Sequence, residues 1–318
     1  MFQKRLLTPY LGAEIIGVDL TQEVDETTKA DILTAWIEHG VLLFRGTPGS
    51  DENHMRLSRI FGEMEAAATK IMNSEDNPFL MNLRHDPHNE DIRINQHYNV
   101  DGQDRAGYIG WHWDQAFMPT IVRGAVLRMI EPASEAGETG FVDAIGAYDR
   151  LPQALRERIE GLEVTYRFCG KMDDNTYGIG KLVPLPRKTK AGESAKTGFD
   201  FPPVVHPMVI TQQETGRKVL KLCPMHFPKV LDMEAEESDA LLTELTGYLL
   251  DPTYAYFHKW QRDDMIVWDN WRVCHMATGV PLDTPRYARR TTIMGDYKVG
   301  RYLDLTLDRN REVARIVD

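Results

Sequence analysis

Short apolar runs, each bounded by glycine, proline or acidic residues, constrain the fold of this chain more than any other feature. They lie at residues 41–44, 125–130, 204–210, 219–222, 265–268 and 291–294. Runs of about four to eight apolar residues between turn formers are typical of strands buried in a sheet, and most helices are longer. We therefore predict a mainly β fold.

Helical spacing of apolar residues is confined to a few segments. It occurs at 27–39, in a segment that Asp51 can cap, at 147–159 and at 236–250. Gly40 can end the first of these helices. The last presents a stripe of leucines on one face, made of Leu241, Leu242, Leu245 and Leu249. Such a stripe needs an apolar surface to cover it, so we expect the helices to pack on the outside of the sheet.

Length and composition favour one globular domain over residues 1–318. The 42% of hydrophobic residues can build a sizeable core. Residues 66–104 lack sustained periodicity, and we interpret them largely as loops around a site. Residues 171–203 contain four prolines and a lysine-rich run. Because long segments without periodicity are often functional, we predict a mobile insertion or lid there.

Charge and cysteine content exclude several classes of function. The formal net charge of -11 disfavours nucleic-acid binding, which needs clustered positive charge. No stretch reaches the roughly 18 apolar residues of a spanning helix, and no signal peptide is visible at the N-terminus. The three cysteines fit neither a disulfide framework nor a CxxC metal site. We expect a cytoplasmic protein.

Three side chains have the chemistry of a metal site. His112 and Asp114 are two positions apart in GYIGWHWDQAF, so on an extended strand they share a face. His275 follows an apolar run in WDNWRVCHMATG. Two histidines and one carboxylate leave three positions of an iron ion open. An isolated HxD pair is often accidental, however, and His112 alone could simply satisfy a strand-end hydrogen bond.

A series of motifs in a fixed order favours the metal site over an accidental HxD pair. The motifs are LGAEIIGVDL, GVLLFRG, WHWDQAFMP, EAGETGFVDA, HPMVITQQETGRK, WDNWRVCHMATG and RYARRTTIMGD. In their order and spacing the chain resembles the taurine dioxygenase (TauD/TfdA) family of Fe(II)/2-oxoglutarate oxygenases. The resemblance covers nearly the whole chain. It implies a double-stranded β-helix, the jelly-roll architecture of the cupins, with Fe(II), 2-oxoglutarate and O2 as cofactor and co-substrates.

The resemblance also implies roles for individual residues. His112 and Asp114 match the family's first metal pair and His275 its distal histidine. Apart from the resemblance, Asp269 and Asn270 are expected to orient His275, because metal-binding histidines usually have a polar partner behind them. The residues that match those holding the 2-oxoglutarate carboxylates are Thr139 and Arg286. Arg286 lies eleven residues beyond His275, and its planar guanidinium suits a bidentate carboxylate.

Two further positions bear on the substrate. Arg290 matches the arginine that meets the sulfonate in the taurine enzyme, and its spacing puts it on the same strand face as Arg286. A buried guanidinium needs an anion, which is either the substrate or an internal Asp or Glu. Tyr108 stands four residues before His112, where the taurine enzyme uses an asparagine to contact substrate. This difference argues against taurine itself.

The sequence thus predicts a dioxygenase that oxidises, most simply hydroxylates, a small anionic organic molecule and releases succinate and CO2. Desaturation, ring formation and bond cleavage remain open as net outcomes. Two alternatives come from other classes: a catalytically silent jelly-roll binding protein, and a zinc hydrolase using the same three ligands. We expect a small-molecule substrate as partner, no nucleic acid or membrane, and a homo-oligomer, either dimer or tetramer.

Overall fold

Two β-sheets dominate the computed structural model, which describes residues 2–66, 73–89, 97–169, 177–178, 180–185, 198–307 and 315–317. The larger sheet has the strand order β1-β2-β3-β18-β8-β20-β4, and β5 also pairs with β20. Its strands are β1 (Gln3–Leu6), β2 (Ala13–Ile16), β3 (Val41–Phe44), β4 (Met64–Glu65), β5 (Met81–His85), β8 (Gly124–Glu131), β18 (Met265–Asp269) and β20 (Arg286–Ile293).

The smaller sheet has the order β11-β6-β7-β19-β9-β17. Its strands are β6 (His97–Val100), β7 (Gln103–His112), β9 (Thr139–Asp143), β11 (Leu182–Pro184), β17 (Tyr256–His258) and β19 (Val273–Val280). The described part of the chain adds a four-stranded sheet and two strand pairs: β16 (Lys229–Val230), β10 (Glu163–Tyr166), β13 (Val204–Pro207) and β21 (Arg301–Tyr302); β12 (Gly198–Asp200) with β22 (Arg315–Val317); and β14 (Val209–Thr211) with β15 (Lys218–Leu220).

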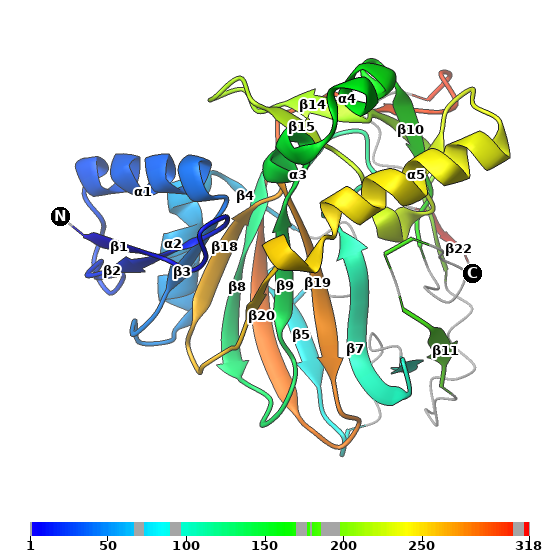
Figure 1. Cartoon of the computed structure of the whole chain (residues 1–318). Coiled ribbons are helices and arrows are strands. Elements are labelled where there is room, and N and C mark those ends of the chain that lie inside the picture. Colours follow the sequence, from blue (N-terminus) through cyan, green and yellow to red (C-terminus); the bar gives the residue numbers. More distant parts are fainter. Residues whose placement is uncertain are drawn as a thin grey trace.

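The helices lie around these sheets (Figure 1). They are α1 (Glu26–His39), α2 (Asp51–Phe61), α3 (Ala144–Arg150), α4 (Gln153–Ile159) and α5 (Ala235–Leu249), with 3-10 turns η4 (Pro224–His226) and η5 (Pro252–Tyr254). Helices α1 and α2 lie beside β1 to β3 at one edge, whereas α3, α4 and α5 lie together at the other end of the molecule. None of the described helices has the length and apolar character that crossing a bilayer requires.

Alternation along the strands of the larger sheet creates two apolar layers. In β18, Met265 and Val267 pack with α1 and α2, whereas Ile266 and Trp268 pack with Phe141 of the smaller sheet. Successive strand side chains point to opposite faces, so a continuous apolar run can supply both layers. The face that bears Trp268 is therefore the interior of the jelly roll. The predicted fold class is confirmed.

Helix α1 begins and ends where the sequence indicates. The side chain of Asp25 accepts a hydrogen bond from the backbone N–H of Thr28 at 2.9 Å, and Gly40 ends the helix with φ at 73°. Helix α2 is capped one residue earlier than predicted, by Ser50 rather than Asp51. The Ser50 hydroxyl accepts from the N–H of Asn53 at 3.0 Å. Both caps satisfy N–H groups that the first helical turn leaves unpaired.

Three predicted segments differ from the structure. The helix expected at 147–159 is two helices, because Pro152 holds the preceding Leu151 in an extended conformation between α3 and α4. The strand expected at 204–210 divides into β13 and β14, which pair in different sheets. Residues 66–104 include strands β5 and β6 and the start of β7, since backbone pairing to neighbouring strands does not need an apolar run. Most of the predicted lid, 171–203, lies outside the described residues.

Candidate metal centre

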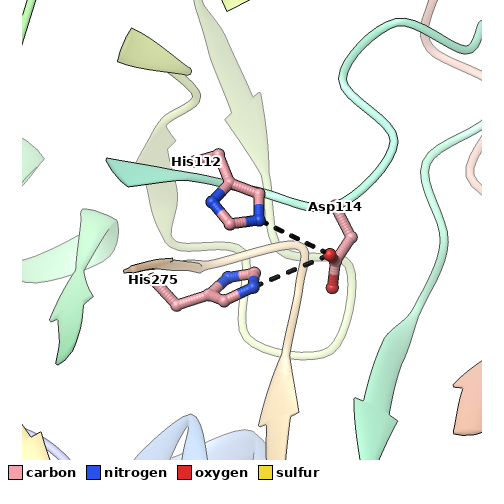
Figure 2. A group of neighbouring side chains, drawn as sticks. All are labelled: His112, Asp114 and His275. Carbon is pink, nitrogen blue, oxygen red and sulfur yellow. Dashed lines mark ion pairs between the residues drawn. The ribbon is translucent and has the colours of Figure 1, made fainter. Parts of the chain in front are cut away.

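His112, Asp114 and His275 come together at one point inside the jelly roll (Figure 2). His112 is the last residue of β7 and pairs directly with His275 of β19, while Asp114 lies two residues beyond the end of β7. One ligand atom from each residue lies within 4.8 Å of the other two. All three residues are buried. The structure thus brings together the three residues that the sequence predicts as ligands.

The two imidazoles present the same nitrogen to the carboxylate. Nε2 of His112 lies 3.8 Å and Nε2 of His275 lies 3.6 Å from Oδ1 of Asp114. Nδ1 of His112 lies 2.8 Å from the carbonyl oxygen of Gly110. Because a carbonyl only accepts, Nδ1 carries the proton and Nε2 keeps a free lone pair. Burial lowers the pKa of both histidines, which keeps them neutral and able to bind a metal.

His275 is oriented mainly by packing. Its ring lies 4.8 Å from the Trp268 ring and 6.3 Å from the Phe141 ring, between centroids. Its Nδ1 is buried and has no hydrogen-bond partner among the described residues. Metal-binding histidines commonly donate their second N–H to a carboxylate or carbonyl, so His275 differs from His112 in this respect.

The second oxygen of Asp114 is already engaged. Oδ2 forms an ion pair with Nη2 of Arg290 at 2.7 Å and accepts a hydrogen bond from the indole nitrogen of Trp268 at 3.2 Å. Burial alone would raise the pKa of Asp114, but the positive charge of Arg290, together with the other groups around the carboxylate, outweighs that effect, and the pKa lies at about 2. The carboxylate is therefore charged, and Oδ1 remains directed at the two histidine nitrogens.

The backbone of Asp114 is held by Asn270 rather than left to a flexible loop. Its N–H donates to Oδ1 of Asn270 at 2.6 Å, and its carbonyl accepts from Nδ2 of Asn270 at 3.1 Å. The expected hydrogen bond from Asn270 or Asp269 to the His275 ring is not found among the described residues. Asp269 instead accepts a hydrogen bond from Nη1 of Arg123 at 2.6 Å. Asn270 and Asp114 are far apart in the chain, so no local sequence pattern predicts their contact.

These observations test whether the residues suit a divalent metal ion. Two neutral imidazole nitrogens and one ionised carboxylate oxygen face one another at short range. This donor set is the 2-His-1-carboxylate arrangement of non-haem iron oxygenases. The residues present therefore fit Fe(II).

The guanidinium of Arg286 has no partner among the described residues. Arg286 is the first residue of β20 and is partly buried, yet its side chain makes no ion pair or hydrogen bond with any residue that the structure describes. Burial lowers the pKa of Arg286 to about 10, which still leaves it charged at neutral pH. Its Cδ lies close to Gly137, where an added Cβ would be 3.5 Å away, and Thr139 follows two residues later.

Thr139 begins β9 and is buried. Its hydroxyl oxygen accepts a hydrogen bond from the indole nitrogen of Trp260 at 3.0 Å. The hydroxyl proton of Thr139 is therefore free to be donated elsewhere. Sequence reasoning missed both Trp260 and Trp268. The alternation of β18 gave a usable signal for Trp268, which shares the inner face with Ile266.

Tyr108 is buried on β7, and burial raises its pKa to about 12. Its hydroxyl makes no hydrogen bond to another residue in the described ranges, and its ring belongs to an apolar cluster that also contains Trp111. The register of β7 against β19 shifts between His112 and Tyr108. His275 pairs with His112, but Ala277 pairs with Ile109. The alternation of side chains counted from His112 therefore does not by itself show on which face of the sheet Tyr108 lies.

Comparison with known proteins agrees with this geometry. The model of the "Taurine catabolism dioxygenase TauD, TfdA family" matches residues 3–292. The (S)-phenoxypropionate/alpha-ketoglutarate-dioxygenase of Sphingobium herbicidovorans is 30% identical over 90% of this chain and 92% of its own length. The alpha-ketoglutarate-dependent 2,4-dichlorophenoxyacetate dioxygenase of Cupriavidus pinatubonensis is 28% identical over 91% and 96%. The crystal structure of AAD-2 with Mn(II) and N-oxalylglycine has a TM-score of 0.72 at 22% identity, covering 94% of this chain and 99% of that one, which shows the shared fold.

The fold and the arrangement of these residues define a non-haem dioxygenase that depends on Fe(II), 2-oxoglutarate and O2. Within that class, the chain belongs to the TauD, TfdA family.

Proposed function

We propose that His112, Asp114 and His275 bind Fe(II) and that the protein oxidises a small anionic organic molecule beside it. The observation that carries this proposal is that the two carboxylate oxygens of Asp114 have different contacts. Its Oδ2 is occupied by Arg290, while Oδ1 points at two histidine Nε2 atoms within 3.8 Å. With iron bound, the site supplies the chemistry that converts 2-oxoglutarate and O2 to succinate and CO2 as the substrate is oxidised.

Arg286 and Thr139 are proposed to hold the far carboxylate of 2-oxoglutarate. A desolvated guanidinium without an anion is costly, and a carboxylate ligand would supply the missing partner. Thr139 already accepts from Trp260, so its own proton can be donated to a carboxylate oxygen. The two residues thus offer charge and a directed hydrogen bond to the same kind of group.

Arg290 is proposed to meet the anionic group of the substrate while it also holds Asp114. Its Nε is buried and has no partner among the described residues, so the guanidinium is only partly satisfied by Asp114. The two relatives are named for the aryloxyalkanoates phenoxypropionate and 2,4-dichlorophenoxyacetate, and both of these compounds are carboxylates. Tyr108, whose hydroxyl lacks a described partner, is proposed as a second substrate contact.

A substrate screen tests the proposal. Sulfonates, sulfate esters, aryloxyalkanoates, amino-acid derivatives and sugar acids are each mixed with the protein, Fe(II), 2-oxoglutarate and O2, and substrate-dependent succinate is measured. A catalytically silent binding protein makes no succinate, and a zinc hydrolase works without O2. Conversion of only neutral or cationic compounds would contradict the anionic substrate class. Mass analysis of the product shows whether hydroxylation or another oxidation is the net outcome.

Several expectations about the protein's setting stay predictions. We propose that residues 1–318 form one domain with a lid near 171–203, and that the protein is a cytoplasmic dimer or tetramer without nucleic-acid or membrane partners. The net charge of -11 supports the absence of a nucleic-acid partner. Analytical ultracentrifugation at several concentrations tests the oligomeric state.

A further inference from the structure

Lys221 is a fully buried lysine that the reaction described above does not use. It follows β15 directly, and about 2% of it is exposed. Its backbone is fixed on both sides: its N–H donates to the carbonyl of Met208 at 2.8 Å, and its carbonyl accepts from the Tyr166 hydroxyl at 3.1 Å. The side chain therefore enters the protein from an anchored position.

The ammonium group contacts two residues next to the metal ligands. Nζ donates a hydrogen bond to the backbone carbonyl of Asn270 at 2.5 Å, and it lies 4.1 Å from the centre of the Trp113 ring. An ammonium close to the face of an indole is attracted by the ring's negative face, and the attraction strengthens where water is excluded. Lys221 thus holds two parts of the chain that are far apart in sequence.

Those two parts carry all three metal ligands. Trp113 stands between His112 and Asp114. Asn270 clamps the N–H and the carbonyl of Asp114 with its side chain, and it begins the segment that leads to His275. A displacement of Asn270 would therefore be transmitted to Asp114 directly. The side chain of Lys221 donates to the backbone carbonyl of Asn270, while the side chain of Asn270 holds Asp114.

Burying a cation at this position has a desolvation cost. Burial lowers the pKa of Lys221 to about 7, although the nearby Asp269 carboxylate acts in the opposite direction. In the described residues Lys221 donates a single side-chain hydrogen bond, whereas an ammonium has three donors. A methionine would fill similar space without the desolvation cost. The contacts with Asn270 and Trp113 are what the lysine provides in addition.

We propose that Lys221 is a positioning residue that braces the segments carrying His112, Asp114 and His275 and so strengthens divalent-metal binding at that centre. The inference rests on the proposed function of the three ligands. Residues that orient metal ligands from behind typically change metal affinity by about 10- to 100-fold when they are replaced. The structure assigns Lys221 to this role through Asn270 rather than through contact with the metal.

The test measures Mn(II) binding to the whole protein by titration of the free Mn(II) electron paramagnetic resonance signal, well below the melting temperature. We expect Lys221→Met to weaken binding by roughly 10- to 100-fold, as for other residues behind metal ligands. Lys221→Gln keeps a donor for Asn270 but loses the charge, so its affinity should fall between those of Lys221→Met and the unaltered protein. Ile32→Val, in the remote core between α1 and the larger sheet, should lower the melting temperature but leave Mn(II) affinity unchanged.

Each outcome decides between distinct conclusions. If the unaltered protein does not bind Mn(II), or if His112→Ala binds it equally well, the proposed metal centre fails and the role of Lys221 fails with it. If the centre binds Mn(II) but Lys221→Met binds it as tightly as the unaltered protein, only the role of Lys221 is overturned. The same follows if Ile32→Val weakens binding as much as Lys221→Met. If Lys221→Met does not fold, unchanged affinity in Lys221→Gln overturns the inference.

Discussion

Arg290 forms an ion pair with Asp114, with Nη2 2.7 Å from Oδ2, so one guanidinium contacts a proposed metal ligand directly. The sequence left two partners open for Arg290, a substrate anion or an internal carboxylate. The structure shows the internal contact, and it also leaves Nε of Arg290 without a described partner. A substrate anion bound there would share the guanidinium with Asp114, which would couple substrate binding to the metal centre.

Arg290→Ala should raise the KM for an anionic substrate by about 10- to 100-fold, because a charge-assisted hydrogen bond contributes on the order of 1.5 to 3 kcal/mol. The KM for 2-oxoglutarate should change by no more than about twofold on the same reasoning, since Arg286 remains. Succinate formed without substrate oxidation should increase, because the substrate is held less firmly. Initial-rate kinetics with both co-substrates check this. Unchanged substrate kinetics would restrict Arg290 to its ion pair with Asp114.

Arg286→Ala should raise the KM for 2-oxoglutarate far more than that for the substrate, by about 30-fold or more for a loss of roughly 2 to 4 kcal/mol. A matched control lies three residues along the same strand. Arg289 points to the other face and pairs with Asp51 of α2, so Arg289→Ala should leave both KM values unchanged. Equal 2-oxoglutarate KM values in the two variants would show that Arg286 does not bind the co-substrate.

Trp260→Phe should raise the KM for 2-oxoglutarate modestly, by about 3- to 10-fold, since the loss of one neutral hydrogen bond costs roughly 0.5 to 1.5 kcal/mol. The ring remains, but the hydrogen bond to Thr139 is lost, and the threonine hydroxyl can then rotate away from the carboxylate. In Thr139→Ala the same tryptophan change should have little further effect. Additive losses in the double variant would mean that Trp260 acts independently of Thr139.

The mainly β fold could be predicted because many of its strands are apolar runs, and the ordered motifs that resemble the TauD/TfdA family implied the jelly-roll architecture. In β18 and β3 every residue but the last of β18 is apolar, and the two layers on either side of the sheet follow from alternation alone. The HxD spacing likewise follows from local chain geometry. Helix α4 was predicted as part of a longer helix because the apolar spacing continues through Pro152, whereas the backbone does not.

The contacts around the ligands could not be predicted in the same way. The clamp between Asn270 and Asp114 and the contact of Lys221 with Trp113 join segments that meet only after the sheets have formed. A lysine within KVLKLC gives no sign in the sequence that its ammonium is enclosed. Burial of a charged group depends on which elements cover it, and local periodicity does not carry that information.

His112→Ala, Asp114→Asn and His275→Ala should each abolish turnover while the fold is kept. Asparagine is preferred at 114 because alanine would leave Arg290 buried without a carboxylate or amide partner. Circular dichroism should be unchanged, and Mn(II) binding should be lost or strongly weakened in all three. Near-normal turnover in any one variant would remove that residue from the proposed metal centre.

The stability of the protein should depend on pH through Lys221. In the unfolded chain this lysine has its ordinary pKa of 10.5, whereas burial lowers the folded-state pKa to about 7. Between these values the unfolded state binds more protons, so the free energy of unfolding should rise with pH, by up to about 1.4 kcal/mol per pH unit from this group. Below pH 7 both states are protonated and the contribution is constant. Urea unfolding at pH 6.5, 7.5 and 8.5 should show the unaltered protein gaining stability relative to Lys221→Met, with the larger gain between pH 7.5 and 8.5. The comparison with Lys221→Met cancels groups that titrate alike in both proteins. Burial raises the pKa of the neighbouring Cys223 to about 12, so this thiol stays protonated in the folded protein over the tested range. A constant difference between the two proteins from pH 6.5 to 8.5 would show that Lys221 keeps its ordinary pKa in the folded state.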